Sequence, residues 1–176
     1  LISRDIASTI VVDNKLKFAE SRKSGIRKAL SLNIEVGESN DVDGFWHVLE
    51  DNLGNRYNAK PVHTASEMKL LMSRFPNNIK LYVAKMNGEI VGGTLIYVTP
   101  QVVHTQYISA SVEGKKHGAL DLLFDYIINK VYANCRYFDF GKSTEQGGAY
   151  LNEPLIFQKE GFGGRGVCYD WYQWEL

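Results

Sequence analysis

The chain has 176 residues, 44% apolar and 12% aromatic, which is enough for one domain with a sizeable core. Its 20 basic residues balance 20 acidic ones, which argues against a protein whose task is to coat nucleic acid. No apolar run approaches the ~20 residues of a membrane span, and no signal peptide opens the chain. Neither the cysteines nor the histidines show metal-ligand spacing. We therefore expect a cytoplasmic protein with no metal site and no membrane span.

Hydrophobic periodicity and capping residues divide the first 75 residues into two strands and three helices. The first helix has one apolar stripe and is otherwise basic. Thr64 and Glu67 form a capping box at the start of the third helix, because each side chain can satisfy the other's free backbone N–H. The predicted elements are a strand at 9–12, a helix at 15–32, a strand at 34–36, a helix from Asp41 or Asp43 to about 55, and a helix that ends before Pro76.

The rest of the chain alternates strands with two helices. Asn87-Gly88 is a favoured two-residue hairpin turn, and apolar residues from Leu120 to Val131 recur at spacings of three and four. The predicted elements are strands at 80–86, 89–98 and 102–108, a helix at 120–131, a strand at 137–140, a polar loop at 141–148, a helix at 152–160 and a strand at 167–174. This order predicts one α/β (α+β) domain over residues 1–176, with a mixed central sheet flanked by helices.

Four segments carry a family resemblance. They are SRKSGIRKA from Ser21, VAKMNGEIVGGTLIY from Val83, YISASVEGKKHGALDLLFDYII from Tyr107, and YFDFGKSTEQGGAYLNEPLIFQKEGFGGRGV from Tyr137. The chain resembles the GNAT-like domain of the FemAB-type aminoacyl and acyl transferases, a family often found in bacterial cell-wall and surface-polysaccharide synthesis. The resemblance implies a GNAT-like fold with the basic helix as an extra N-terminal element. It also implies that the chain is the C-terminal half of a longer protein with a second GNAT-like domain.

The resemblance places a catalytic lysine at Lys159, just ahead of a Gly-Phe-Gly turn. Acyl transfer passes through a tetrahedral intermediate whose oxyanion a fixed cation stabilises. The alternative is a solvated lysine at a helix end. Family members commonly have an aromatic residue directly before this lysine, whereas here Gln158 stands there and Phe157 is one place earlier.

In the family's fold two central strands splay apart, and donor and acceptor meet in the gap. The loop that follows the strand at 137–140 would lie at its mouth. Ser143 and Thr144 are predicted to orient an acceptor amine, Glu145 is the preferred base and Asp139 is the second candidate. The alternative is a polar turn in which Asp139 holds a backbone amide.

In GNAT enzymes the loop before the long helix, here Ser109 to His117, binds the pyrophosphate of acetyl-CoA. The usual Gly-x-Gly core is absent, because Gly114 and Gly118 stand four residues apart. The candidate phosphate contacts are Gly114, Lys115, Lys116 and Gly118, and the alternative is a flexible loop. We expect no tightly bound cofactor, and acyl-CoA or aminoacyl-tRNA as the donor substrate.

The basic helix offers Arg22, Arg27 and Lys28 to an anionic acceptor such as a nucleotide-linked sugar, with a solvated helix face as the alternative. The leading hypothesis is an acyltransferase or aminoacyltransferase acting on an amine of a cell-wall or surface-polysaccharide precursor, with tRNA only as a donor. The alternatives are an acetyl-CoA-dependent N-acetyltransferase acting on an amino sugar and a non-catalytic binding domain. The four histidines are scattered and are assigned no chemistry.

Overall fold

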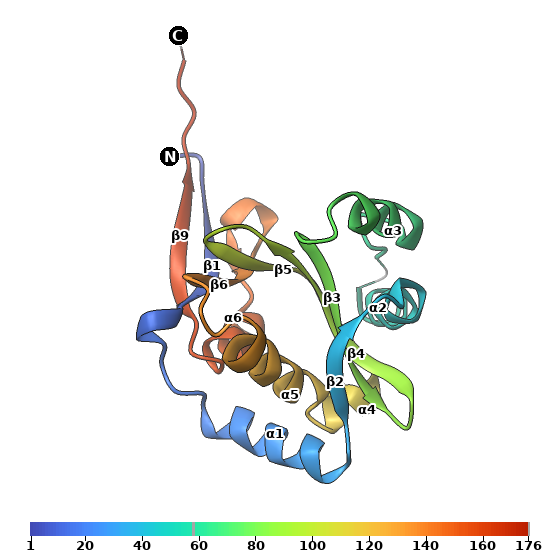
Figure 1. The fold of residues 1–176 in the computed structure, drawn as a ribbon. Helices are drawn as coiled ribbons and strands as arrows, with labels where there is room; N and C mark the ends of the chain where they lie inside the picture. Colours follow the sequence, from blue (N-terminus) through green and yellow to red (C-terminus); the bar gives the residue numbers. More distant parts are fainter. Residues whose placement is uncertain (58, 176) are drawn as a thin grey trace.

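The computed structural model of the chain describes residues 1–57 and 59–175. Its centre is a seven-stranded sheet in the order β2-β3-β4-β5-β6-β1-β9, beside a small β7–β8 ribbon (Figure 1). Neighbouring strands are antiparallel apart from β5 and β6, which are parallel. The strands are β1 (Ser3–Val11), β2 (Glu35–Ser39), β3 (Ile79–Met86), β4 (Glu89–Val98), β5 (Val102–Ala110), β6 (Tyr137–Lys142), β7 (Thr144–Glu145), β8 (Tyr150–Leu151) and β9 (Arg165–Trp171).

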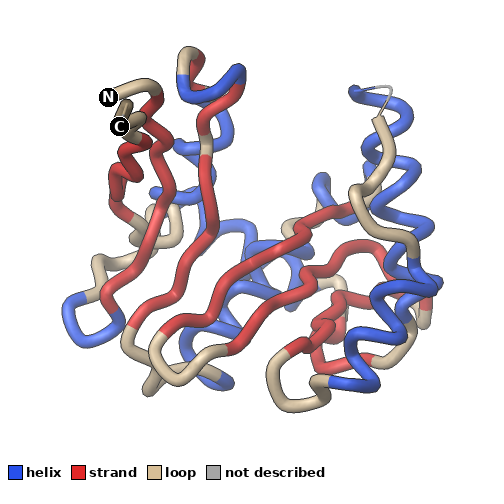
Figure 2. Tube along the Cα trace, turned by 90° about the horizontal axis from the view of Figure 1, so that it is seen from above, coloured by secondary structure: helices blue, strands red, loops and turns tan. Residues whose placement is uncertain are grey.

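Helices cover the sheet on both sides (Figures 1 and 2). On one face lies α5 (Ala119–Tyr126), which continues into the π-helical turn η2 (Ile127–Val131) and carries α1 (Glu20–Ser31) on its outer side. The other face is covered over β3 to β5 by α2 (Val42–Tyr57) and α3 (Ala65–Arg74). The remaining helical segments are η1 (Val12–Asn14), α4 (Val112–Lys116), η3 (Gln146–Gly148) and α6 (Glu153–Glu160). The α/β architecture predicted from the sequence, a mixed sheet flanked by helices with an extra N-terminal helix, is confirmed.

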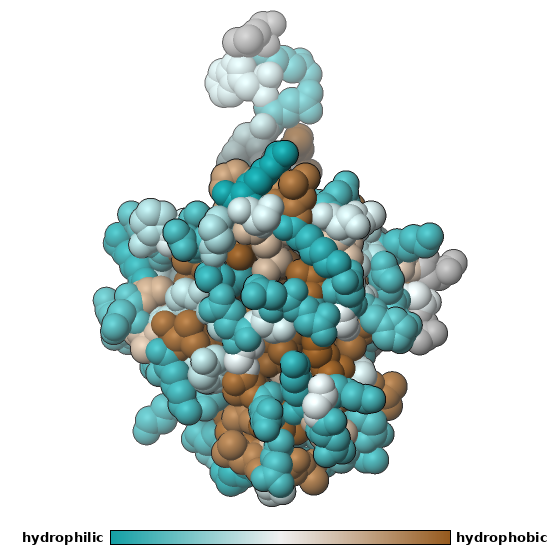
Figure 3. Space-filling model, turned by 45° about the vertical axis from the view of Figure 1, so that its right-hand side comes forward, coloured by the Kyte–Doolittle hydropathy of each residue, from teal (hydrophilic) through white to brown (hydrophobic). Residues whose placement is uncertain are grey.

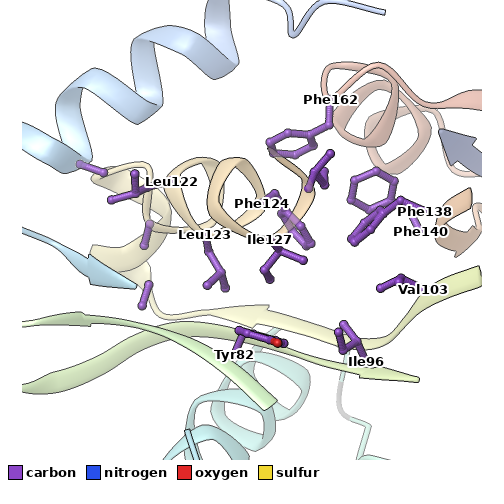
Figure 4. Close-up of a cluster of buried hydrophobic side chains, with 14 of the residues drawn as sticks. Tyr82, Ile96, Val103, Leu122, Leu123, Phe124, Ile127, Phe138, Phe140 and Phe162 are labelled. Atoms are coloured by element: carbon purple, nitrogen blue, oxygen red, sulfur yellow. The ribbon is translucent and has the colours of Figure 1, made fainter. Parts of the chain in front are cut away.

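Two apolar clusters hold these layers together. On the α5 face, Phe124 packs among Phe138, Phe140 and Phe162, with ring centroids 5.1–6.3 Å apart (Figure 4). On the other face, Phe45 of α2 is fully buried against the sheet. Each such side chain contributes about 1.5–3 kcal/mol through the apolar area that it removes from water. The clusters fix the helices on the sheet and so set the positions of the loops between them.

Several local predictions are confirmed. Thr64 Oγ1 accepts a hydrogen bond from the Glu67 N–H at 3.2 Å, and the Glu67 carboxylate accepts one from the Thr64 N–H at 2.7 Å. Asp41 caps α2, since its carboxylate accepts a hydrogen bond from the Gly44 N–H at 2.9 Å. Asn87 and Gly88 have φ angles of +54° and +85°, as a type I′ hairpin turn requires.

Other boundaries predicted from the sequence are wrong. The first helix begins at Glu20, because the segment before it is extended and the Ala19 N–H donates to the Gly161 carbonyl at 2.8 Å. The N-terminal strand is longer than predicted and lies inside the sheet, between β6 and β9. The segment before the long helix contains α4 and is not a loop throughout, since Ser111 Oγ accepts a hydrogen bond from the Gly114 N–H and caps a helical turn. Part of the predicted polar loop at 141–148 belongs to β6 and the β7–β8 ribbon.

The last strand is β9, which starts and ends earlier than predicted and forms an edge of the sheet. Residues 172–175 extend away from the body of the molecule (Figures 1 and 3), and Trp174 is 86% exposed. Within residues 1–57 and 59–175, no helix has both the length and the apolar character needed to cross a bilayer. In the same residues, no three His, Cys, Asp or Glu side chains gather where a metal ion could bind.

Candidate active site

The parallel strands β5 and β6 pair over only three residues and then diverge. The last pair is His104 with Asp139. Just beyond it each strand gains an extra residue relative to its other neighbour, since β5 bulges at Gln106 against β4, and β6 bulges near Gly141 against β1. Bulges occur more often than expected next to active sites, where they re-aim side chains or end strand pairing. The splayed strands expected from the resemblance are therefore present at this point.

Lys159 of α6 reaches the end of β6 at this divergence. Asn152 caps α6 by accepting a hydrogen bond from the Leu155 N–H, which fixes where the helix starts and so where Lys159 lies. The Lys159 side chain is buried, with 5% of the residue exposed. Its Nζ donates to the carbonyls of Gly141 and Lys142 at 3.0 and 2.7 Å and to Ser143 Oγ at 3.0 Å. The solvated lysine considered from sequence is therefore excluded.

The charge of Lys159 depends on its surroundings. Burial lowers the pKa of its amine to about 8, and the nearby Asp139 carboxylate acts in the opposite direction. At neutral pH the amine is still mostly protonated, so the end of β6 holds a buried positive charge. A charge in such a place acts on its neighbours more strongly than it would in water. This is the electrostatic condition that an oxyanion of acyl transfer needs.

The three polar residues after β6 lie in different surroundings. Ser143 is buried against Lys159, with 1% of the residue exposed. Thr144 is also buried; its hydroxyl donates to Asp5 Oδ1 at 2.6 Å and accepts from the Ile6 N–H at 3.3 Å. Glu145 is exposed, and its carboxylate accepts a hydrogen bond from Asn152 at 2.7 Å. Ser143 is therefore the member of the predicted trio in direct contact with Lys159.

Asp139 is buried and accepts two hydrogen bonds. Thr9 Oγ1 donates to one carboxylate oxygen at 2.8 Å, and the His104 Nδ1 lies 2.7 Å from the other. Burial alone would raise the pKa of the Asp139 carboxyl, but the hydrogen bonds from His104 and Thr9 outweigh it and lower the pKa. Asp139 holds two side chains, and the backbone contact considered from sequence is present as its weakest interaction, from Gly141. Sequence reasoning missed His104, because only the register of β5 on β6 brings it to Asp139.

A pocket of about 280 Å³ lies between α1, α4–α5 and α6. Four of the residues predicted to bind donor or acceptor line it, namely Arg22, Gly114, Lys115 and Gly118. A second pocket, of about 510 Å³, lies on the other side of α4 against α2, and Lys115 lines both. The structure thus brings the predicted phosphate-contact segment and Arg22 together at one depression.

The two glycines of this segment also have a structural explanation. A Cβ on Gly114 would lie 2.0 Å from the Val91 carbonyl oxygen, so α4 can pack on β4 only with glycine there. Gly118 has a φ of +73°, and a Cβ on it would lie 2.4 Å from the Gly25 carbonyl oxygen of α1. Close packing accounts for both glycines, and their predicted role as phosphate contacts stays a prediction.

The three basic residues predicted on the first helix do not form one cluster. Arg22 turns inward, pairs with Asp121 at 2.7 Å and lies 5.4 Å above the Phe162 ring. Arg27 and Lys28 are exposed, and the Lys28 amine donates to the Lys116 carbonyl at 2.9 Å. Burial raises the pKa of the Asp121 carboxyl, although Arg22 acts against this shift. Arg22 therefore lines the pocket, while Arg27 and Lys28 face outward.

Comparison with known proteins gives the following similarities. Residues 17–150 match a family model described as "Acetyltransferase (GNAT) domain". FemX superposes with a TM-score of 0.68 at 13% identity, over 92% of this chain and 59% of FemX. The C-terminal domain of a candidate lysylphosphatidylglycerol synthetase from Agrobacterium fabrum superposes with a TM-score of 0.66 at 12% identity. The match covers 92% of this chain and 57% of the synthetase chain. An aminoglycoside acetyltransferase from an uncultured soil metagenomic sample, in complex with sisomicin, superposes with a TM-score of 0.54 at 15% identity. The match covers 84% of this chain and 99% of the acetyltransferase.

At these identities the solved structures show a shared fold. The chain spans less than two thirds of the length of FemX and of the synthetase domain, and nearly the whole of the aminoglycoside enzyme. A search of curated proteins returns no significant match to this sequence.

Proposed function

Because the chain belongs to the acetyltransferase (GNAT) domain family, we propose that it transfers an acyl or aminoacyl group to an amine of a cell-wall or surface-polysaccharide precursor. The likeness of its fold to FemX and to the synthetase domain supports a FemAB-type member of the family. Since the chain spans about three fifths of those two proteins, the proposal includes a second GNAT-like domain that completes the acceptor site.

The observation that carries this proposal is the buried Lys159 at the point where β5 and β6 diverge. All three N–H groups of its ammonium have acceptors, and one of these is Ser143 Oγ. Because Ser143 accepts from Lys159, its own O–H remains to donate to an incoming carbonyl oxygen. The charge of Lys159 strengthens that donation and stabilises the oxyanion as it forms. Ser143 and Lys159 thus polarise the donor's carbonyl together.

The donor in this proposal is an acyl-CoA or an aminoacyl-tRNA, bound as a substrate and not as a resident cofactor. The pocket between α1, α4–α5 and α6 is the candidate place for the donor's phosphates, since Arg22 and Lys115 line it. The N-terminal end of α5 adds a favourable field for an anion. Exposed Arg27 and Lys28 then bind the phosphates of a nucleotide-linked acceptor.

A second candidate function is acetyl-CoA-dependent N-acetylation of an amino sugar. It is favoured by the coverage of the aminoglycoside acetyltransferase, which this chain matches over 99% of its length. Calorimetry separates the two candidates. Tight, stoichiometric binding of acetyl-CoA favours N-acetylation, whereas an absence of heat favours an aminoacyl donor.

The test of function is a panel of two donors and two acceptors. Acetyl-CoA and a tRNA charged with a labelled amino acid are each offered to a nucleotide-linked amino sugar and to an amine-bearing peptide precursor. We expect a new amide with one donor, seen as a mass increase of the acceptor equal to the transferred group. Transfer by none of the combinations would favour the third candidate, a binding domain that keeps this fold without the chemistry.

A further inference from the structure

His104 and Asp139 form a hydrogen-bonded pair that the proposed function has not used. They face each other across the last rung of the parallel β5–β6 pairing, with Nδ1 and Oδ2 2.7 Å apart. Asp139 is buried and its second oxygen is held by Thr9, whereas 35% of the His104 side chain is exposed. The carboxylate is therefore fixed, and the imidazole is the member of the pair that a solute can reach.

The hydrogen bonds decide which ring nitrogen of His104 carries the proton. The hydrogen bonds to Asp139 lower its pKa, so its carboxyl is ionised at neutral pH and can only accept. The Nδ1 of His104 must then be the donor. In the neutral imidazole the Nε2 has a free lone pair, so the pair has the arrangement of a base held by a carboxylate.

The pair lies next to the residue that Lys159 binds. The Gly141 carbonyl oxygen accepts a hydrogen bond from the Lys159 amine at 3.0 Å, and a Cβ on the same glycine would lie 3.2 Å from His104 Cε1. The imidazole and the ammonium thus approach one residue. In acyl transfer the attacking nitrogen and the oxyanion oxygen are bonded to one carbon. A base that acts on the nitrogen and a cation that acts on the oxygen must therefore lie close to each other.

Other candidate bases fit less well. Among the described histidines, His47 is on the surface of α2, His117 pairs with the exposed Glu113, and His63 pairs with a tyrosine hydroxyl. Glu145 is exposed and lies against the cap of α6. Asp139 itself is enclosed, with both carboxylate oxygens engaged.

We propose that His104 takes the proton of the acceptor amine, with Asp139 as its positioning residue; the inference rests on the proposed acyl transfer. The free amine attacks the donor's carbonyl carbon, and a C–N bond forms. The nitrogen gives one proton to His104 Nε2, and the bond from the carbonyl carbon to the donor's sulfur or oxygen breaks. The imidazolium then returns the proton to that leaving group. The products are an amide and a free thiol or hydroxyl.

Titratable groups from several elements surround the His104–Asp139 pair. Asp139 faces it from β6, and Tyr97 of β4 lies 6.5 Å from it between ring centroids. Burial raises the pKa of Tyr97, and burial with the charge of Asp139 raises that of Tyr169 on β9, so both phenols stay neutral between pH 5 and 8. Lys159 of α6 titrates at a pKa of about 8. The alkaline limb of the rate profile therefore belongs to Lys159.

The test uses His104→Asn, because the asparagine amide stands near the position of Nδ1 and can still donate to Asp139. We expect kcat/KM to fall about 100-fold and the acid limb of the rate profile to disappear, as for loss of a general base. Asp139→Asn should also lower kcat, with KM changed less. His47→Asn is the matched control, since His47 is 79% exposed and pairs with Asp51 at 3.4 Å. It should leave the rate and its pH profile unchanged.

A second measurement does not depend on turnover. Nitrogen-15 NMR of the histidine side chains should show that the neutral form of His104 carries its proton on Nδ1 and none on Nε2, and Asp139→Asn should change that tautomer. A neutral His104 that carries its proton on Nε2 in the wild type would overturn the inference even if transfer occurs. So would a His104→Asn enzyme that keeps the wild-type acid limb. Absence of transfer by the wild type with every donor would instead overturn the proposed function, and this inference with it.

Discussion

The two halves of the sheet bury different kinds of residue. In the half made of β2 to β5, helices cover both faces of the central strands, and β4 buries six consecutive residues, Val91 to Ile96, none of them charged. In the half made of β6, β1 and β9, the face toward α5 is apolar, with Phe138 and Phe140. The opposite face of this half holds the buried carboxylates Asp5 and Asp139, and Lys159 is buried at the end of β6.

This difference indicates which half of the sheet carries the reactive groups. Burying an ionised side chain costs free energy unless hydrogen bonds and opposite charges compensate for it. Such groups with shifted pKa values cluster at functional sites. We therefore interpret the β2–β5 half as a scaffold and the β6–β1–β9 half as the reactive part. Substitutions that disturb apolar packing in the first half should cost stability without changing rates, and substitutions of buried charged residues in the second half should change rates and pH dependence.

The largest expected effect on stability is at Gly114, where α4 packs on β4. Gly114→Ala places a methyl group 2.0 Å from the Val91 carbonyl oxygen, so the backbone must shift. We expect a loss of about 3 kcal/mol of unfolding free energy, measured by urea denaturation. Gly54→Ala in α2 is the control; a Cβ there meets no atom within 4 Å, and the change should stabilise by about 0.5–1 kcal/mol. Equal stability of the two variants would mean that α4 is not packed in this way.

The pH dependence of stability tests the buried charge in the other half. The pKa of Lys159 is about 8 in the folded chain against an ordinary 10.5, so between these values the unfolded chain binds a proton that the folded chain lacks. Stability should therefore rise with pH across this window, by roughly 3 kcal/mol in total, and Lys159 should add no pH dependence well below pH 8. Lys159→Met should lack the rise. Parallel curves for the two proteins from pH 7.5 to 10 would show that Lys159 is not buried as a charge.

Two threonines compare the halves at a smaller scale. Thr94 of β4 is fully buried, and within the described part of the chain its hydroxyl has no hydrogen-bond partner. Thr144 donates to the Asp5 carboxylate. Thr144→Val should lower Tm by about 5 °C, whereas Thr94→Val should leave Tm unchanged or raise it, because it removes an unpaired buried hydroxyl. The comparison fails if the two variants melt at the same temperature.

The sequence predicted the scaffold half better than the reactive half, for physical reasons. Strands β3 and β4 and helix α5 depend on local signals, such as the Asn87-Gly88 turn and the apolar spacing from Leu120. The place of β1 between β6 and β9 depends on pairing between residues far apart in the sequence, as in Thr9 with Asp139, which are 130 positions apart. Local patterns carry no information about such pairing.

The candidate site shows the same limit. The family resemblance pointed to Lys159, and its contact with Ser143 agrees with the predicted neighbourhood, although nothing in the sequence indicated the burial of the amine. His104 was missed because β5 and β6 meet only in the folded sheet. The inward turn of Arg22 could have been predicted, since it shares a helix stripe with the buried Ala29 and lies four residues before Ile26. Its pairing with Asp121 could not.

The measurement that tests the account most directly is the single-turnover rate of acyl transfer by Lys159→Met and by Leu95→Ala, each corrected for its folded fraction. Leu95 is a fully buried residue of β4, so its loss should cost about 3 kcal/mol of stability and leave the corrected rate within about twofold of wild type. Lys159→Met should lower the corrected rate by about 100-fold or more, because the oxyanion loses its cation. A wild-type rate for folded Lys159→Met, or an equal loss in both variants, would contradict the division of the sheet into scaffold and reactive halves.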